Sequence, residues 1–568
     1  MKLGSDRCFG WLSSLGLLAL ATPLNAQTLL PTQTEIGGYE ESYGLDCQTH
    51  FGPVSGEFRI NQFQGYDQIW SSVAIAENGY VFAFSSGQDV WARFYDDDLQ
   101  PVTGEFQVNT NLINDIQDEP ALAVGTTGNV LIAWSDRNGY DGEQMGIYGR
   151  IYNADAQPLD AEIQINESWQ ASQWRPLISP TPTGGWVVAW TGNWDGDSFI
   201  RILDEDGTPL SGDIRVHEYH WDAQVDPSVA VDGNGDIFVS FVDFSSHDPS
   251  ATGLNLYGRT YAPDGMPYQN EEFLITSWLG DGAQRQPRVA PFAEGFVVVF
   301  EEELGDPSGY GLYARLYDGQ GTPLAPEFQV NTTTTNNQVD CGVASTPDGR
   351  FVVAWEDESQ GPPRIVAQRF AAGGAKVGGE FVVAEDPLGR LRPVLAMDAQ
   401  GEDLVIAYDG SVGGFNATEA FARHYVQAQG PIAYCTGKLN SAGCVPSIAS
   451  TGIPSESSPD PFTITASDVR NRNFGLLFYG DAWTETPFGG GLFCVGSFLS
   501  RTPMQHSGGG PGQTCNGSYE INFNQIIQNE SYPGLAPGKV IFAQYIYRDP
   551  QDPFGVGLTD ALRFAICP

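Results

Sequence analysis

A short segment of alternating polar and apolar residues recurs along roughly the first three-quarters of the chain. It is GEFRIN at residues 56–61, and six related segments begin at residues 104, 161, 212, 271, 326 and 379. Alternation with a period of two is typical of a strand with one buried face. The copies lie 48 to 59 residues apart, so each belongs to a repeat unit of about 54 residues.

Three further strands are predicted between successive copies. PSVAVDGNGDIFVSF at 227–241 contains two apolar runs joined by a tight glycine turn, and segments such as GLYARLYDGQGTP at 311–323 supply a third. Four short strands at this period indicate the blades of a β-propeller. The last set of strands has no such segment after it, whereas GEFRIN precedes the first set. The sequence therefore predicts a seven-bladed propeller over residues 56–430, closed by its N-terminal strand.

One basic and one acidic position recur in every predicted blade. We expect them to form a structural ion pair in each blade, because a catalytic site needs particular groups in one place and not seven equivalent copies. The basic residues are Arg93, Arg150, Arg201, Arg259, Arg315, Arg369 and Arg423, and the acidic residues are Glu57, Glu105, Glu162, Asp213, Glu272, Glu327 and Glu380.

The N-terminus resembles an export signal. Lys2 and Arg7 precede an apolar run at residues 11–21, and a cleavage site is expected after Ala26. Residues 1–26 are thus a predicted signal peptide and 27–55 a lead-in segment of a secreted, extracellular or periplasmic protein. No later apolar run is long enough to span a bilayer. The formal net charge of −43 argues against a nucleic-acid partner, and we expect a monomer.

The repeat ends before a C-terminal region at residues 431–568. Alternating apolar strands, glycine-rich turns and five cysteines predict a disulfide-containing β-sandwich, with FNQIIQN as its one candidate for a short helix. The five cysteines are expected to hold two bridges. Cys341 stands where five of the other predicted blades have a proline, and we expect it to be a free, buried thiol.

Two parts of the chain resemble known secreted proteins. Units such as GIYGRIYNADAQPLDAEIQIN resemble the repeats of large bacterial exoproteins, over about two-thirds of the chain. The segments NSAGC, GLLFYG, QYIYRDP and LTDAL resemble a cysteine-containing domain at the ends of secreted bacterial proteins. These resemblances imply architecture and secretion, and they assign no catalytic residue.

The loops between predicted blades contain exposed aromatic residues beside carboxylates. Such groups hold sugar rings by stacking and by hydrogen bonds to hydroxyls, although packing between blades is an alternative for some of them. The candidate ligand-binding residues are Trp169, Trp174, Tyr219, His220, Trp221, Asp222 and Trp278.

A metal site is a weaker hypothesis. His217 and His220 have the spacing of metal ligands, but no helix brings them to one face, so loop polarity is favoured. Asp232, Asn234 and Asp236 alternate as in a calcium loop but fall on a tight turn that recurs in the blades. We therefore predict no cofactor, with calcium as the one alternative.

These features favour a secreted binding or surface-associated protein that recognises an extracellular glycan or protein on one propeller face. A glycoside hydrolase or polysaccharide lyase on a propeller scaffold is the first alternative, and a structural matrix component is the second. The balance is against an enzyme, because the sequence contains no nucleophile elbow, P-loop, zinc-protease signature or sialidase Asp-box.

Overall fold

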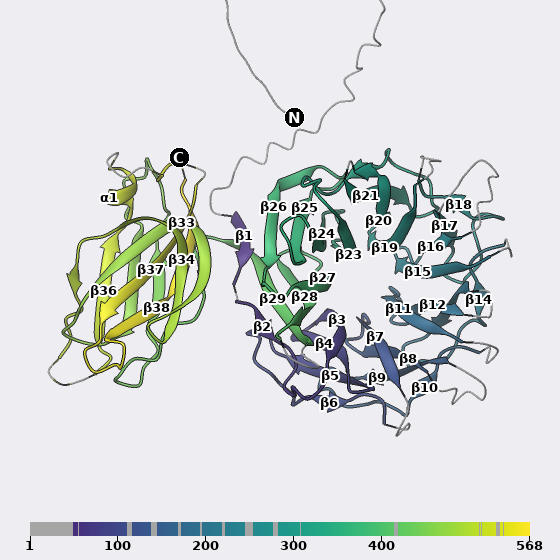
Figure 1. The fold of residues 1–568 in the computed structure, drawn as a ribbon, viewed down its shortest axis with the longest axis horizontal. Helices are drawn as coiled ribbons and strands as arrows, with labels where there is room; N and C mark the ends of the chain where they lie inside the picture. The colour runs from purple at the N-terminus through teal and green to yellow at the C-terminus, as the bar shows by residue number, and fades with distance from the viewer. Residues whose placement is uncertain are drawn as a thin grey trace, which may run out of the picture. The chain divides into compact units, whose positions relative to one another are not determined.

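The regular secondary structure of the described residues is almost entirely β-strand (Figure 1). The computed structural model describes residues 49–54, 56–110, 116–137, 145–167, 172–192, 196–218, 222–244, 254–276, 282–306, 308–413, 418–510, 512, 514–529, 534–537 and 539–567. Within these ranges the one α-helix is α1 (Asn524–Ile527), which lies in the segment predicted to be helical. No helix in the described ranges is long and apolar enough to cross a membrane.

Six four-stranded antiparallel sheets follow one another along the chain. The first three contain β3 (Gln68–Ala76), β4 (Gly79–Ser86), β5 (Asp89–Tyr95) and β6 (Phe106–Gln107); β7 (Gln117–Val124), β8 (Val130–Asp136), β9 (Gly146–Tyr152) and β10 (Ile163–Gln164); and β11 (Trp174–Pro180), β12 (Trp186–Gly192), β13 (Asp197–Leu203) and β14 (Ile214–Arg215). The next three contain β15 (Gln224–Val231), β16 (Ile237–Asp243), β17 (Asn255–Tyr261) and β18 (Phe273–Leu274); β19 (Gln284–Phe292), β20 (Gly295–Asp306), β21 (Gly309–Asp318) and β22 (Phe328–Gln329); and β23 (Gln338–Ser345), β24 (Phe351–Asp357), β25 (Arg364–Phe370) and β26 (Lys376–Ala384).

A seventh sheet joins the two ends of this array. It contains β27 (Arg390–Met397), β28 (Asp403–Ser411) and β29 (Thr418–Gln429), and β29 also pairs with the N-terminal strands β1 (Thr49–Pro53) and β2 (Phe58–Arg59). The segment GEFRIN supplies β2, whereas β1 was not predicted. The innermost strand of each sheet contacts the innermost strand of the next, and β27 contacts β3, so the sheets form a β-propeller-like ring (Figure 1).

The apolar cores lie between neighbouring sheets. The second strand of each sheet is buried along most or all of its described length, as in β4 and β12, which explains the continuous apolar runs of the sequence. One core joins Phe82 and Phe84 of the first sheet to Val405 and Ala407 of the seventh, so burial of apolar surface also connects the two ends of the array.

The repeated arginine binds across the boundary between sheets. In five sheets its Nη1 donates to a backbone carbonyl beside the outermost strand of the preceding sheet; the pairs are Arg93 with Ile60, Arg150 with Val108, Arg201 with Ile165, Arg259 with Val216, and Arg315 with Ile275. The tyrosine two residues later donates to the same carbonyl in four of these sheets. In these four sheets the arginine and the tyrosine two residues after it together bind the preceding sheet.

The predicted pairing of the repeated arginine and acid needs two corrections. The ion pair is present at 3.9 Å for Arg201 and Asp213 and at 3.8 Å for Arg315 and Glu327. The repeated acid, however, also accepts backbone N–H groups of the preceding sheet, as Glu105 does from residues 62 and 63. Arg369 does not occupy the repeat position. Gln368 lies opposite Val353 there, and a shift of one residue turns a side chain to the other face of the sheet.

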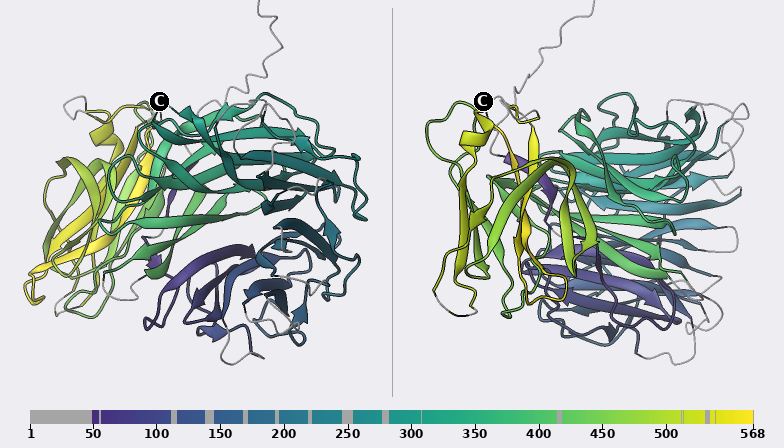
Figure 2. Two further views of the ribbon diagram at one scale, coloured as in Figure 1. Left: turned by 45° about the vertical axis from the view of Figure 1, so that its right-hand side comes forward. Right: turned by 60° about the vertical axis from the view of Figure 1, so that its left-hand side comes forward.

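Residues beyond the ring form two further sheets that share one core (Figure 2). The larger has β30 (Ile432–Tyr434), β33 (Phe474–Phe488), β34 (Gly491–Arg501), β35 (Gln505–His506), β37 (Val540–Arg548) and β38 (Val556–Ala565), and the smaller has β31 (Ser447–Thr451), β32 (Thr463–Val469) and β36 (Gly517–Asn522). The disulfides Cys435–Cys494 and Cys444–Cys515 agree in number with the two bridges predicted for this region, although their pairing was not predicted, and Cys567 is also disulfide-bonded.

Candidate functional site

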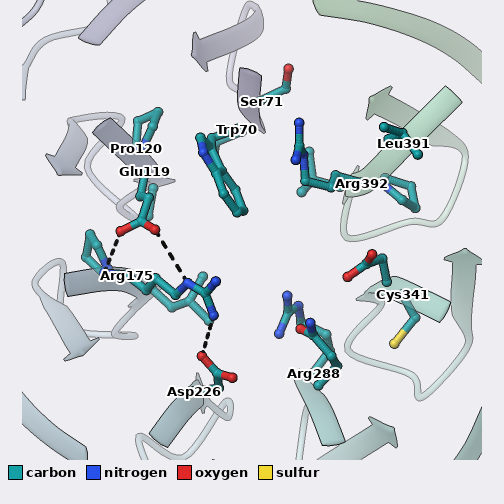
Figure 3. Close-up of a pocket in the computed structure, with 18 of the residues that line it drawn as sticks. Trp70, Ser71, Glu119, Pro120, Arg175, Asp226, Arg288, Cys341, Leu391 and Arg392 are labelled. Atoms are coloured by element: carbon teal, nitrogen blue, oxygen red, sulfur yellow. Dashed lines mark hydrogen bonds and ion pairs between the residues drawn. The ribbon is translucent and has the colours of Figure 1, made fainter. Parts of the chain in front are cut away.

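Seven residues with positive φ surround a central cavity, one from the innermost strand of each sheet (Figure 3). We call this set the αL ring. Its members, with their φ angles, are Trp70 (60°), Glu119 (56°), Arg175 (56°), Asp226 (51°), Gln286 (52°), Asp340 (48°) and Arg392 (52°).

Each member of the αL ring sits in a β-bulge. The pairing register between first and second strand shifts at this point in every sheet, for example between Ile69 and Ser72. A left-handed conformation costs a residue with a side chain on the order of 1–2 kcal/mol. Strained backbone of this kind persists only where the surrounding structure imposes it, and it is concentrated at functional sites.

The neighbouring sheet holds the bulge in place. In five sheets the backbone N–H of the ring residue donates to a side chain on the second strand of the preceding sheet. The acceptors are Asp409 for Trp70 at 3.0 Å, Ser135 for Arg175 at 3.0 Å, Thr191 for Asp226 at 3.1 Å, Glu301 for Asp340 at 2.7 Å, and Glu356 for Arg392 at 2.6 Å. These bonds satisfy backbone donors that the bulge removes from the sheet.

The cavity enclosed by the αL ring has a volume of about 360 Å³, which is within the range of ligand pockets. Its side chains are chemically different from sheet to sheet, unlike the repeated arginines at the sheet boundaries. Besides the ring it is lined by Ser71, Ser72, Arg288, Cys341 and Glu356, together with proline and apolar side chains.

Arg175 organises one side of the cavity. Its Nε lies 3.4 Å from Oε1 of Glu119, its Nη1 lies 2.7 Å from Oδ1 of Asp226, and its backbone N–H donates to Oε2 of Glu119 at 3.1 Å (Figure 3). Three ring residues from consecutive sheets are thereby joined. Both carboxylates therefore have a guanidinium beside them, and Arg137 also lies 3.8 Å from Glu119.

Trp70 lies between two guanidinium groups. Arg392 is 4.7 Å from the centre of its ring system and Arg175 is 5.8 Å away. Cation–π attraction fixes the orientation of the indole, which Figure 3 shows extending into the cavity. An aromatic side chain in such a position offers an edge or a remaining face to a sugar ring.

Glu356 is the distinctive titratable group of the cavity. The residue is 4% exposed, and burial together with the negative charge of Asp340 raises the pKa of its carboxyl to about 8, against the opposing effect of the Arg392 amide. Oε1 accepts that amide, and among the described residues no hydrogen bond reaches Oε2. At neutral pH Glu356 is therefore a carboxylic acid that lines a cavity and has a proton to donate.

The two equivalent carboxylates are different. Glu301 is paired with Arg285 at 2.6 Å and Asp409 with Arg392 at 2.8 Å, and neither lines the cavity. Cys341 is free and buried, as predicted, and burial raises the pKa of its thiol to about 12. Thiolate chemistry at neutral pH is thus disfavoured, and Glu356 remains the group suited to acid catalysis.

The predicted ligand-binding residues are only partly covered by the described ranges. Trp169, Tyr219, His220, Trp221 and Trp278 lie outside them. Trp174 begins β11 and lines a second hollow of about 440 Å³, which shares Glu119, Arg175 and Asp226 with the central cavity. Asp222 is exposed and does not line either hollow.

The predicted metal positions have structural roles. Oδ1 of Asp232 accepts the backbone N–H groups of Asn234 and Asp236 at 2.9 Å each, which is the hydrogen bonding of a tight turn. His217 is buried beside Phe241, with Nε2 at 3.3 Å from Asp197. Within the described ranges no group of three or more His, Cys, Asp or Glu side chains is arranged to hold a metal ion.

The sequence contains a signal for the αL ring that the predicted ligand-binding residues do not include. Five of its members stand directly before a proline that recurs at the start of the innermost strand, namely Pro120, Pro176, Pro227, Pro287 and Pro393. The proline is repeated, but the residue before it is a different polar or charged type in almost every sheet. Variation at a fixed position of a repeat is typical of a site rather than of a scaffold.

Comparison with known proteins identifies no family. No family model matches the chain, and no curated protein matches its sequence. Solved structures with weak similarity include the polysaccharide lyase Uly1 (8% identity, 67% of this chain and 98% of that chain, TM-score 0.42). The α-L-arabinofuranosidase Arb93A from Fusarium graminearum shows 13% identity over 66% of this chain and 98% of its own, with a TM-score of 0.41. A protein of unknown function from Dyadobacter fermentans shows 10% identity over 66% and 99%, with a TM-score of 0.40. Similarity at this level assigns no activity, so function must be argued from the cavity.

Proposed function

We propose that this protein is a secreted glycosidase that cleaves an extracellular carbohydrate in the cavity of a seven-bladed propeller, with residues 431–568 forming a separate β-sandwich domain. The observation that carries this proposal is Glu356: a buried, cavity-lining carboxyl that has no arginine partner among the described residues and keeps its proton at neutral pH. Cleavage of a glycosidic bond needs such an acid together with a second carboxylate.

The residues that line the cavity suggest the role of each group in cleavage. Glu356 donates its proton to the glycosidic oxygen as the bond to the anomeric carbon breaks. The Asp340 carboxylate, which also lines the cavity, stabilises the positive charge that develops on the sugar. Water then adds to the anomeric carbon and returns a proton to the carboxyl pair, so atoms and charge balance. Trp70 supports the sugar ring.

A binding protein without catalysis is the second candidate. One observation favours it. Glu356 accepts the backbone N–H of a ring residue from the next sheet, as Glu301 and Asp409 do at the equivalent positions of their sheets. This structural role alone would explain a carboxyl at position 356. Binding alone requires the cavity and the aromatic side chain but no proton donor.

The two candidates are separated by Glu356→Gln with Glu301→Gln as its matched control. Both replacements keep a carbonyl oxygen that accepts the bulge amide. A carbohydrate array identifies a ligand, and release of reducing ends from that ligand is then measured. We expect Glu356→Gln to bind the ligand but to lose at least 100-fold in release, while Glu301→Gln releases at the wild-type rate. If the wild type binds without release, or if both variants release equally, the glycosidase proposal is wrong.

A further inference from the structure

Arg288 is a cation of the cavity that forms no ion pair within the described residues. The residue lies on β19, is half-buried, and extends toward the middle of the cavity from the side opposite Trp70 (Figure 3). Its one hydrogen bond within the described residues is from Nη1 to the carbonyl of Pro287 at 2.9 Å. Most donors of its guanidinium thus have no protein acceptor there.

The other two arginines of the cavity are neutralised. Arg175 is paired with Asp226 at 2.7 Å and with Glu119 at 3.4 Å, and Arg392 is paired with the buried Asp409 at 2.8 Å. Arg288 forms no ion pair with any carboxylate in the described part of the chain. A half-buried guanidinium is normally paired, because its desolvation is otherwise uncompensated. The missing partner is therefore expected to come from a ligand.

The nearby acids leave room for an anion. Glu119 lies near both Arg175 and Arg137, Asp226 is paired with Arg175, and Asp409 is paired with Arg392, so each of these acids already has a cationic partner. Asp340 is the remaining ionisable carboxyl of the lining besides Glu356. Gln286 adds an uncharged amide on the strand that carries Arg288.

We propose that the sugar bound in this cavity carries an anionic substituent, and that Arg288 binds it. This inference rests on the proposed function and specifies its substrate class as acidic sugars. A guanidinium binds a planar carboxylate through two parallel hydrogen bonds, and it binds a sulfate ester by the same donors. The net charge of −43 does not oppose a short acidic ligand, because exposed charges are screened beyond about 8 Å at physiological salt.

Direct binding measurements with simple sugars test the proposal on the full mature chain. The probes are the methyl glycosides of glucuronic and galacturonic acid, the neutral methyl glucoside and galactoside, and a 6-sulfated glucoside, titrated by ligand-observed NMR. The variants are Arg288→Gln, which removes the charge, and Arg288→Lys, which keeps it. Arg501→Gln, at an exposed position far from the cavity lining in sequence, is the control.

We expect the acidic sugars to bind the wild type at least 10-fold more tightly than their neutral counterparts. Arg288→Gln should abolish that difference without weakening the neutral sugars, Arg288→Lys should restore part of it, and the control should change nothing. Tighter binding of the sulfated probe than of the uronides identifies a sulfate ester as the natural substituent.

Two results overturn the inference in distinguishable ways. If neutral and acidic sugars bind equally, or if Arg288→Gln weakens both equally, the inference fails, whereas loss of release in Glu356→Gln still supports the glycosidase. If no sugar of either class binds the wild type, both proposals fail. Equal melting temperatures of wild type and Arg288→Gln exclude a folding defect as the cause.

Discussion

Two sets of positions occur once per sheet in this ring, and they differ in residue type, in backbone conformation and in the contacts that they make. The arginines at the sheet boundaries are chemically the same in six sheets, and in five of these the guanidinium donates to a backbone carbonyl of the preceding sheet. The members of the αL ring share a strained backbone conformation, yet they include tryptophan, arginine, glutamine and both acids.

The difference teaches how a repeat protein separates stability from function. The boundaries between sheets have similar packing, so arginine occupies the same position in six of the seven sheets, and its loss is expected to affect folding. The cavity is a single place to which every sheet contributes a member of the αL ring, so identical residues at those positions would supply only one kind of chemistry. Chemical variety on a repeated, strained backbone is therefore the signature of the site.

The largest effect is expected from removing the strands that close the ring. A chain that starts at Gln68 lacks β1 and β2, and with them the carbonyl of Ile60 that receives Arg93 and Tyr95. The edge of β29 and the core between the first and seventh sheets become exposed, so we expect calorimetry to show a broad transition at a much lower temperature. A chain that starts at Gly56 keeps β2 and should be affected less. Unfolding of the shorter chain at the wild-type temperature and width would rule out closure by this strand.

The next largest effect is expected at a sheet boundary. Arg259 is 3% exposed and donates to the carbonyls of Val216 and Asn270 and to Glu218. Arg259→Ala removes a buried guanidinium and its hydrogen bonds across the sheet boundary, although Tyr261 still donates to Val216, and should lower the free energy of unfolding by about 3 kcal/mol. Ligand binding per folded molecule should be unchanged. Arg501→Ala, at an exposed position, should stay within about 0.5 kcal/mol in the same urea titration.

A smaller effect, on the pH dependence of the free energy of unfolding, is expected in the cavity. The pKa of Glu356 is raised from 4.5 to about 8 in the folded chain, so the folded state binds this proton more tightly than the unfolded state. Its stabilising contribution is complete below about pH 4.5 and is lost as the pH rises through 8. Between pH 6.5 and 9 the wild type should therefore lose on the order of 2 kcal/mol relative to Glu356→Gln.

The control for this pH dependence is Glu402→Gln, which changes an exposed carboxyl. Its stability should follow that of the wild type at every pH. Parallel curves for the wild type and Glu356→Gln would show that Glu356 is ionised at neutral pH, and the cavity would then have no buried acid.

The sequence predicted the scaffold better than the site, for physical reasons. Alternation and buried second strands are local patterns, so the strands and the N-terminal GEFRIN partner were visible in the chain. The left-handed conformations of Trp70 and Asp340 are held by acceptors on the preceding sheet. The acceptor for Asp340 is Glu301, more than 30 residues earlier, and the acceptor for Trp70 is Asp409, at the other end of the ring. No local sequence pattern encodes such distant contacts. Arg369 was misplaced because its strand carries arginine one residue beyond the repeat position.

The smallest effect measures the strain of the αL ring directly. Gln286 has a φ of 52°, is half-buried, and its side chain has no hydrogen bond to the described residues. Glycine adopts positive φ without the penalty that alanine pays, so Gln286→Gly should be about 1 kcal/mol more stable than Gln286→Ala. Gln107, in β6, has no positive φ, and there the order should reverse because glycine weakens a strand. If alanine is the more stable residue at both positions, the bulge of β19 is not strained, and the cavity does not depend on backbone strain to hold its side chains.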